Sequence, residues 1–235
     1  MLDLMVEAGS VGINVAIESG NQRVMDKIVL KPVNLETVPP LIRKVHDAGL
    51  WVIANFIIGF PGESWDEIRE TIEFAEKCGA DYVKFFIAVP LKGTKMWDMA
   101  SDTGTIVHDE GSGVVDWRFS QIISDEWTSE DISILRAYEW DRINFASPEK
   151  MKAMVKLWSV SELELSALRK KTRDAVTSRV LGTTQAVDEV HGRKNGDTST
   201  ADSDQVYGDP KLSSPASPSP AQRWVDPAST RVVIS

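Results

Sequence analysis

Cysteine is almost absent from this chain of 235 residues, which contains only Cys78. A single cysteine excludes an intrachain disulfide framework, and it excludes a metal or iron–sulfur site built from several cysteines of this chain. The three histidines have no partners at the spacing of metal ligands, so no residue is predicted to bind a metal. Cys78 ends an amphipathic helical pattern, which predicts a buried and unreactive thiol.

Long hydrophobic runs and an excess of positive charge are also lacking. The apolar stretch around Ile53–Ile58 is too short to span a bilayer, and the first ten residues do not have the pattern of a signal peptide. Lys and Arg total 26 against 35 Asp and Glu, and the net charge of −9 argues against a protein that grips nucleic-acid phosphates. We therefore predict a cytoplasmic protein with neither a membrane nor a nucleic-acid partner.

Composition divides the chain into three parts. Residues 1–105 alternate between strand and helix patterns, and residues 106–184 form a predicted helical extension. Helix N-caps are predicted at Thr128, Ser147 and Ser161. Residues 185–235 are rich in Ser, Pro, Gly, Asp and Thr and cannot bury enough apolar surface to offset chain entropy, so they are predicted to be a disordered tail.

The first part has the pattern of an α/β fold. Three nearly continuous apolar runs predict strands covered on both faces, at about 11–17, 51–58 and 82–89. Between them, Pro39-Pro40 opens one helical pattern and the capping-box sequence Ser64–Glu67 opens another. Such alternation predicts parallel strands wound right-handed, with the helices outside.

Ligands of parallel α/β folds bind where the strands end, so the loops after the three strands are the candidate site. Glu18 and Ser19 put a carboxylate beside a hydroxyl, which suits a ribose diol or an amino group. The alternative is a plain turn with Glu18 paired to a lysine or arginine. Lys31 and its basic neighbours form either a solvated helix face or a contact to a ligand carboxylate.

The second loop, Gly59–Ser64, joins a strand to a helix. Its glycines allow a ligand to approach the backbone, although a tight turn that feeds the next helix explains them equally well. Phosphate binding at this helix start is a third interpretation, which the negative charge of Glu63 would oppose. The third loop begins at Pro90.

In this order and spacing, the loops resemble the radical SAM superfamily, most closely the group that often carries an upstream cobalamin-binding domain. The resemblance covers about residues 1–105 and rests on the segments Ala16–Met25, Asn55–Ser64 and Val89–Thr94. It implies a partial α/β barrel, half of a TIM barrel, in which residues 11–89 supply the fourth to sixth strands.

The resemblance also implies S-adenosylmethionine as the bound cofactor. It assigns Glu18 and Ser19 to the ribose and amino-acid part of that molecule. It assigns to the adenine the residues Ile57, Gly59, Glu63, Pro90 and Leu91. No catalytic residue is assigned.

One part of the family pattern is missing. The family holds a 4Fe-4S cluster on a Cys-x-x-x-Cys-x-x-Cys loop after its first strand, and this chain has only Cys78. We therefore expect the C-terminal part of a radical SAM enzyme, inactive alone, either as a fragment or as a truncated product. The complete enzyme would cleave S-adenosylmethionine reductively, for radical chemistry or for methyl transfer through cobalamin. The isolated chain is expected to bind S-adenosylmethionine weakly or not at all.

Two other functions stay open. The open edge of the first strand can pair with the missing half-barrel or with another chain, which would make this a non-enzymatic interaction domain. The third interpretation is an unrelated phosphate-binding α/β enzyme.

Overall fold

The computed structural model describes residues 1–106, 119–180, 223–225 and 232–234. The elements of the N-terminal part are α1 (Leu2–Glu7), β1 (Gly12–Glu18), α2 (Gln22–Val24), a π-helical turn (Met25–Val29), a 3-10 turn (Leu35–Thr37), α3 (Val38–Asp47), β2 (Trp51–Ile58), α4 (Trp65–Lys77) and β3 (Tyr82–Ile87). After them come α5 (Lys95–Asp102), α6 (Ser129–Asn144), α7 (Pro148–Trp158), α8 (Glu162–Val180), β4 (Arg223–Val225) and β5 (Val232–Ile234).

The first three strands form one parallel sheet in the order β1-β2-β3. β1 pairs with β2 in parallel, from Gly12 opposite Trp51 to Glu18 opposite Phe56. The bonds from Asp81 N to Val52 O and from Ala88 N to Ile58 O, both 3.0 Å, advance in the same direction along β2 and β3. The predicted parallel strands and partial α/β barrel are therefore confirmed.

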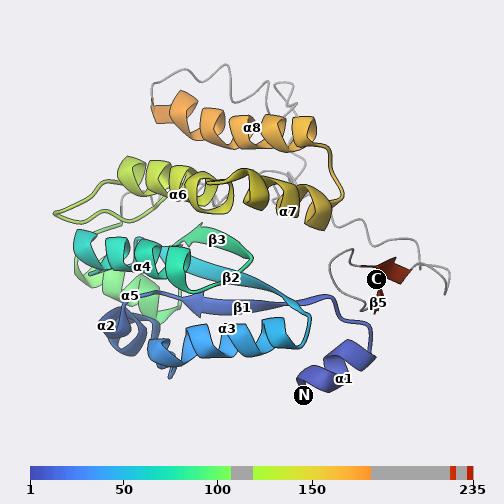
Figure 1. Cartoon of the computed structure of the whole chain (residues 1–235). Coiled ribbons are helices and arrows are strands. Elements are labelled where there is room, and N and C mark those ends of the chain that lie inside the picture. Colours follow the sequence, from blue (N-terminus) through green and yellow to red (C-terminus); the bar gives the residue numbers. More distant parts are fainter. Residues whose placement is uncertain (107–118, 181–222, 226–231, 235) are drawn as a thin grey trace. The chain divides into compact units, whose positions relative to one another are not determined.

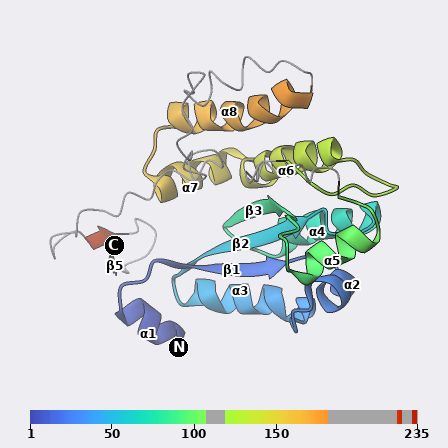
Figure 2. The same ribbon diagram turned by 180° about the vertical axis from the view of Figure 1, so that it is seen from behind.

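The two faces of the sheet differ in burial. Along β2, Val52, Ala54 and Phe56 are fully buried, whereas the residues between them are only half-buried. Phe56 meets Phe74 of α4 edge-to-face, with 6.2 Å between ring centroids. Helix α3 runs alongside β1 and β2 in both views (Figures 1 and 2). Burial on both faces was predicted, but only the helix-covered face of β2 is fully buried. The prediction failed because apolar composition does not show which face of a strand is covered by other elements.

The described residues separate into two compact units. The first unit comprises residues 1–56, 66–84, 223–225 and 232–234, and the second comprises 57–65, 85–106 and 119–180. The sequence-predicted domain ranges of 1–105 and 106–184 stay a prediction.

Helix caps in the second unit agree with the sequence. Thr128 and Asp131 form a reciprocal capping box at the start of α6, and the Ser147 hydroxyl accepts from Lys150 N. Glu164 Oε2 accepts from the backbone N–H of Ser161, and this bond lowers the pKa of the Glu164 carboxyl. All three predicted helix starts are confirmed.

Charged side chains connect α6 with α8 in this unit. Asp141 binds Arg169 through two bonds, of which Nε to Oδ1 measures 2.6 Å, and its Oδ2 lies 2.7 Å from Arg173 Nη1. Arg169 also lies over the ring of Phe145, with 4.7 Å from Cζ to the centroid. These contacts hold α6 and α8 together.

Most of the predicted tail, residues 185–235, lies outside the described residues. Its two described segments, β4 and β5, pair antiparallel. His108 and His191 also lie outside the described residues. Within the described part of the chain, no helix is long and apolar enough to cross a membrane.

Candidate functional site

Glu18 ends β1 in an unusual backbone conformation. Its φ is +82°, in the left-handed region that costs a non-glycine residue about 1 kcal/mol, and the β1–β2 register shifts between Ala16 and Glu18. The Nζ of Lys31 donates to the Ala16 carbonyl and lies 3.2 Å from Glu18 Oε1. Glu18 is thus paired with a lysine, as the alternative interpretation of this turn predicts. A strained backbone of this kind is typical of functional positions.

Lys31 reaches β1 through an irregular segment rather than from a regular helix face. The π-helical turn ends at Val29, Leu30 adopts a left-handed φ of +58°, and Lys31 N donates to Met25 O at 3.2 Å. The sequence offered Lys31 and its basic neighbours as a solvated helix face or as a contact to a ligand carboxylate, and it did not predict the contact of Lys31 with Ala16 and Glu18. No sequence signal marks the π-helical turn, so the position of the Lys31 side chain could not be predicted.

Ser19 follows Glu18 but points into the protein. Its side chain is fully buried, and its Oγ lies 3.0 Å from Thr71 Oγ1 on α4 and accepts from Asn21 N at 3.1 Å. The Ser19 hydroxyl is therefore engaged inside the first unit. Thr71 was not singled out in the sequence, because a threonine inside a helical pattern gives no sign of what its hydroxyl contacts.

The Gly59–Glu63 segment, in the second unit, is closed by its own carboxylate. Glu63 is 2% exposed, and its Oε2 accepts from Gly59 N at 2.8 Å and from Phe60 N at 2.9 Å. Gly59 adopts a φ of +79°, which favours glycine. The carboxylate occupies the two backbone donors that a phosphate would need, so this geometry does not favour the phosphate-binding interpretation.

Two residues before α6 hold the same segment. The indole Nε1 of Trp127 donates to the Glu63 carbonyl at 3.0 Å, and Trp127 is 2% exposed. Glu126 Oε2 accepts from Trp65 N, the first residue of α4, at 2.7 Å. The sequence did not reveal this contact of Trp127 to a loop more than sixty positions away.

The third candidate segment lies after β3 in the second unit. Ala88 N donates to Ile58 O at 3.0 Å, so the ends of β2 and β3 are neighbours. Pro90 is buried and Leu91 is 45% exposed, while Ile57 is half-buried. Gly59 and Pro90 thus follow adjacent strand ends, as the sequence predicts.

The sequence-predicted site residues fall into two groups. Glu18 and Ser19 belong to the first unit, and the other five belong to the second. Within each unit the predicted residues lie together at strand ends. Their assignment to a cofactor stays a prediction.

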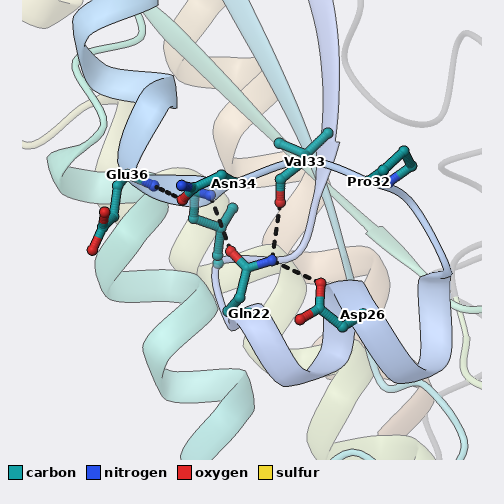
Figure 3. Close-up of a pocket in the computed structure, with 8 residues that line it drawn as sticks. Gln22, Asp26, Pro32, Val33, Asn34 and Glu36 are labelled. Carbon is teal, nitrogen blue, oxygen red and sulfur yellow. Dashed lines mark hydrogen bonds between the residues drawn. The ribbon is translucent and has the colours of Figure 1, made fainter.

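A separate cavity of about 670 Å³ lies beside α2 in the first unit (Figure 3). Gln22 organises its wall: Nε2 donates to Asp26 Oδ1 at 2.9 Å and to Val33 O at 3.0 Å, and Oε1 accepts from Leu35 N at 3.0 Å. The donors of this amide are both engaged within the protein. Of the residues that line the cavity, Gly20 and Gln22 belong to the segment Ala16–Met25, and none of the seven predicted site residues lines it.

The residues of this chain do not fit an iron–sulfur cluster. Cys78 is the one cysteine of the sequence, is 2% exposed, and its thiol donates to the Ala75 carbonyl at 3.4 Å, as expected for a buried structural thiol. Among residues 1–106 and 119–180, no three His, Cys, Asp or Glu side chains gather in a metal-binding group. An iron–sulfur cluster would need cysteine ligands from outside this chain.

Comparison with known protein families matches residues 1–75 to the family described as the Radical SAM superfamily. The matched range contains Glu18, the Gly59–Glu63 segment and most of α4. This chain belongs to the radical SAM superfamily. The resemblance to this superfamily is confirmed.

Individual relatives of this radical SAM chain are named as methyl- or methylthio-transferring enzymes. It is 31% identical over 169 residues to a cytidylyl-2-hydroxyethylphosphonate methyltransferase of Streptomyces wedmorensis, covering 69% of this chain and 32% of the relative. It is 31% identical to an uncharacterised methyltransferase of Pyrococcus horikoshii, with coverage of 56% and 28%. A tRNA-2-methylthio-N(6)-dimethylallyladenosine synthase of Pseudomonas savastanoi is 28% identical, with coverage of 46% and 25%. The chain thus spans a quarter to a third of these relatives.

Proposed function

We propose that this chain supplies part of the S-adenosylmethionine-binding region of a radical SAM enzyme that transfers a methyl or methylthio group. The observation that carries the proposal is the family match over residues 1–75, a range that includes Glu18 with its strained backbone. The names of the relatives support the reaction class. The proposal includes the possible use of cobalamin in the complete enzyme. It names no substrate, and it assigns no residue of this chain to a substrate or to cobalamin.

Glu18 and Lys31 are the proposed contacts in the first unit. The Glu18 carboxylate can accept hydrogen bonds from ribose hydroxyls or from the ammonium group of the methionine part. The Lys31 ammonium can pair with the carboxylate of the methionine part. The Glu18 side chain is 21% exposed and that of Lys31 35% exposed, so both can meet a ligand. This donor set fits a zwitterionic nucleoside. Ser19, whose hydroxyl is buried, acts through the conformation of the turn.

In the second unit, the proposed adenine contacts are of a different kind. Leu91 is exposed and Ile57 half-buried, so they offer apolar surface to a flat base. Pro90 shapes the backbone next to Leu91. Gly59 and Glu63 are proposed to fix the loop, because the Glu63 carboxylate is already bonded to Gly59 N.

The 4Fe-4S cluster of a complete enzyme is proposed to be bound by cysteines outside this chain. Within the described residues, β1 pairs with β2 on one side only, and its other edge can accept a strand. A half-barrel or another chain pairing there is the proposed partner, and the chain alone is proposed to be inactive. A reducing, cytoplasmic setting agrees with a sequence whose one cysteine cannot form an intrachain disulfide.

The same open edge favours the second candidate function, a non-enzymatic interaction domain. In that case β1 binds a partner strand, and Glu18 and Lys31 serve only to stabilise the register shift at the end of β1. Binding of S-adenosylmethionine distinguishes the two functions.

Calorimetry on the purified, iron-free chain tests the proposal. We expect S-adenosylmethionine to bind with a dissociation constant of about 1 mM, because no cluster holds its methionine part. Glu18→Gln should weaken this binding by about tenfold through loss of charge-assisted bonds. The matched control Glu73→Gln, an exposed residue of α4, should leave it unchanged. Micromolar affinity without iron, or equal binding by Glu18→Gln, would contradict the proposal.

A further inference from the structure

One face of α4 holds the turn that follows Glu18. Glu67, Glu70 and Thr71 have the spacing i, i+3, i+4 and lie on the same side of the helix. The Glu67 carboxylate accepts hydrogen bonds from both Nε and Nη2 of Arg23, and the distance from Nη2 to Oε2 is 2.5 Å. Glu70 Oε2 accepts from Asn21 Nδ2 at 2.5 Å. The two outer contacts are exposed ion-pair and amide contacts, whereas the Thr71 contact is buried.

Thr71 makes that buried contact with two successive residues of the turn. Its side chain is fully buried, and its Oγ1 lies 3.0 Å from Ser19 Oγ and accepts from Gly20 N at 3.1 Å. Ser19 Oγ in turn accepts from Asn21 N at 3.1 Å. The hydroxyl pair formed by Ser19 and Thr71 thus provides acceptors for two part-buried backbone N–H groups, those of Gly20 and Asn21.

Gly20 permits this contact because the turn lies directly against the helix. A Cβ at Gly20 would lie 2.5 Å from Phe74 Cβ and 2.8 Å from Thr71 Cα. The backbone is therefore seated on α4 with no room for adjustment. Ser19 and Gly20 immediately follow Glu18. Because both are held against α4, the backbone direction after Glu18 is fixed.

We infer that Thr71 is a positioning residue that holds the Glu18–Asn21 turn in the conformation that presents the Glu18 carboxylate. This inference rests on the proposed function for its purpose, whereas the contacts of Thr71 with Ser19 and Gly20 are observed independently of that function. Thr71 itself does not contact the cofactor. The strained φ of Glu18 is maintained because the turn after it cannot move.

Amide hydrogen exchange of the full chain tests the inference with a conservative pair of variants. Thr71→Val keeps the shape and removes the hydroxyl, so Gly20 N–H should exchange about tenfold faster. Thr71→Ser keeps the hydroxyl and should restore exchange to within about twofold of the unmodified chain. The control Thr172→Val removes a buried hydroxyl that bonds only Leu168 O within α8, and it should leave Gly20 unchanged.

Unchanged exchange at Gly20 in Thr71→Val would overturn the inference. Equal acceleration at Val52 and Ala54 in the sheet would also overturn it, since that result indicates general unfolding. If Thr71→Val does not fold, Ser19→Ala decides instead: Asn21 should exchange faster while Gly20, still bonded to Thr71, should not, and loss of protection at Gly20 would overturn the inference.

A second measurement separates this inference from the proposed function. S-adenosylmethionine should shift the Glu18 amide resonance in the unmodified chain and in Thr71→Ser, but not in Thr71→Val. A missing shift in the unmodified chain would count against the proposed function alone, because the exchange data decide the role of Thr71.

Discussion

Replacing Glu63 by alanine should lower the free energy of unfolding of the second unit by about 3 kcal/mol. The substitution leaves the buried N–H groups of Gly59 and Phe60 without their acceptor, and each such loss costs about 1–3 kcal/mol. Glu63→Gln keeps an acceptor of the same size but loses the charge, so it should cost only about 1 kcal/mol. Urea unfolding followed by tryptophan fluorescence measures both effects.

The control for Glu63 is a glutamate of α4. Glu73 is exposed and forms an i,i+4 pair with Lys77, so Glu73→Ala should change stability by less than about 0.5 kcal/mol. A loss below about 1 kcal/mol for Glu63→Ala would show that its carboxylate does not hold the loop.

Gly20→Ala should destabilise the first unit by about 3 kcal/mol. The added methyl group would lie 2.5 Å from Phe74 Cβ and 3.1 Å from Glu70 O, and neither can move without displacing α4. Because α4 carries Phe74 against Phe56 of β2, the strain should spread into the sheet. Urea unfolding followed by circular dichroism provides the measurement.

Gly104→Ala serves as the comparison. A Cβ there meets nothing within 4 Å, and only its φ of +65° disfavours alanine, so the loss should be about 1 kcal/mol. If Gly20→Ala destabilised the protein no more than Gly104→Ala, the close seating of the turn on α4 would be wrong.

The strands and helix starts could be predicted because their signals are local. The apolar run at 51–58 coincides with β2, and β1 is displaced by one residue from its predicted range. β3 ends at Ile87, shortly before Pro90, which lacks the N–H needed to continue a ladder. The caps at Thr128 and Ser161 follow from hydroxyl and carboxylate spacing alone.

The site was predicted less completely, because its contacts join residues that are distant in sequence. Glu63 was expected to repel an anion at the start of α4, and the structure shows that its carboxylate instead accepts the loop's own N–H groups. Ser19 pairs with Thr71, fifty-two positions away. Neither the burial of Ser19 nor the position of Lys31 has a local pattern, so both required the fold.

An amide NMR titration of the iron-free chain with S-adenosylmethionine tests the central claim most directly. The claim predicts shifts at Glu18, Gly20, Asn21, Gly59 and Leu91 that saturate with a dissociation constant of about 1 mM. Contradiction would come from an unchanged spectrum at about 10 mM ligand, or from shifts confined to the cavity around Gln22 and Val33.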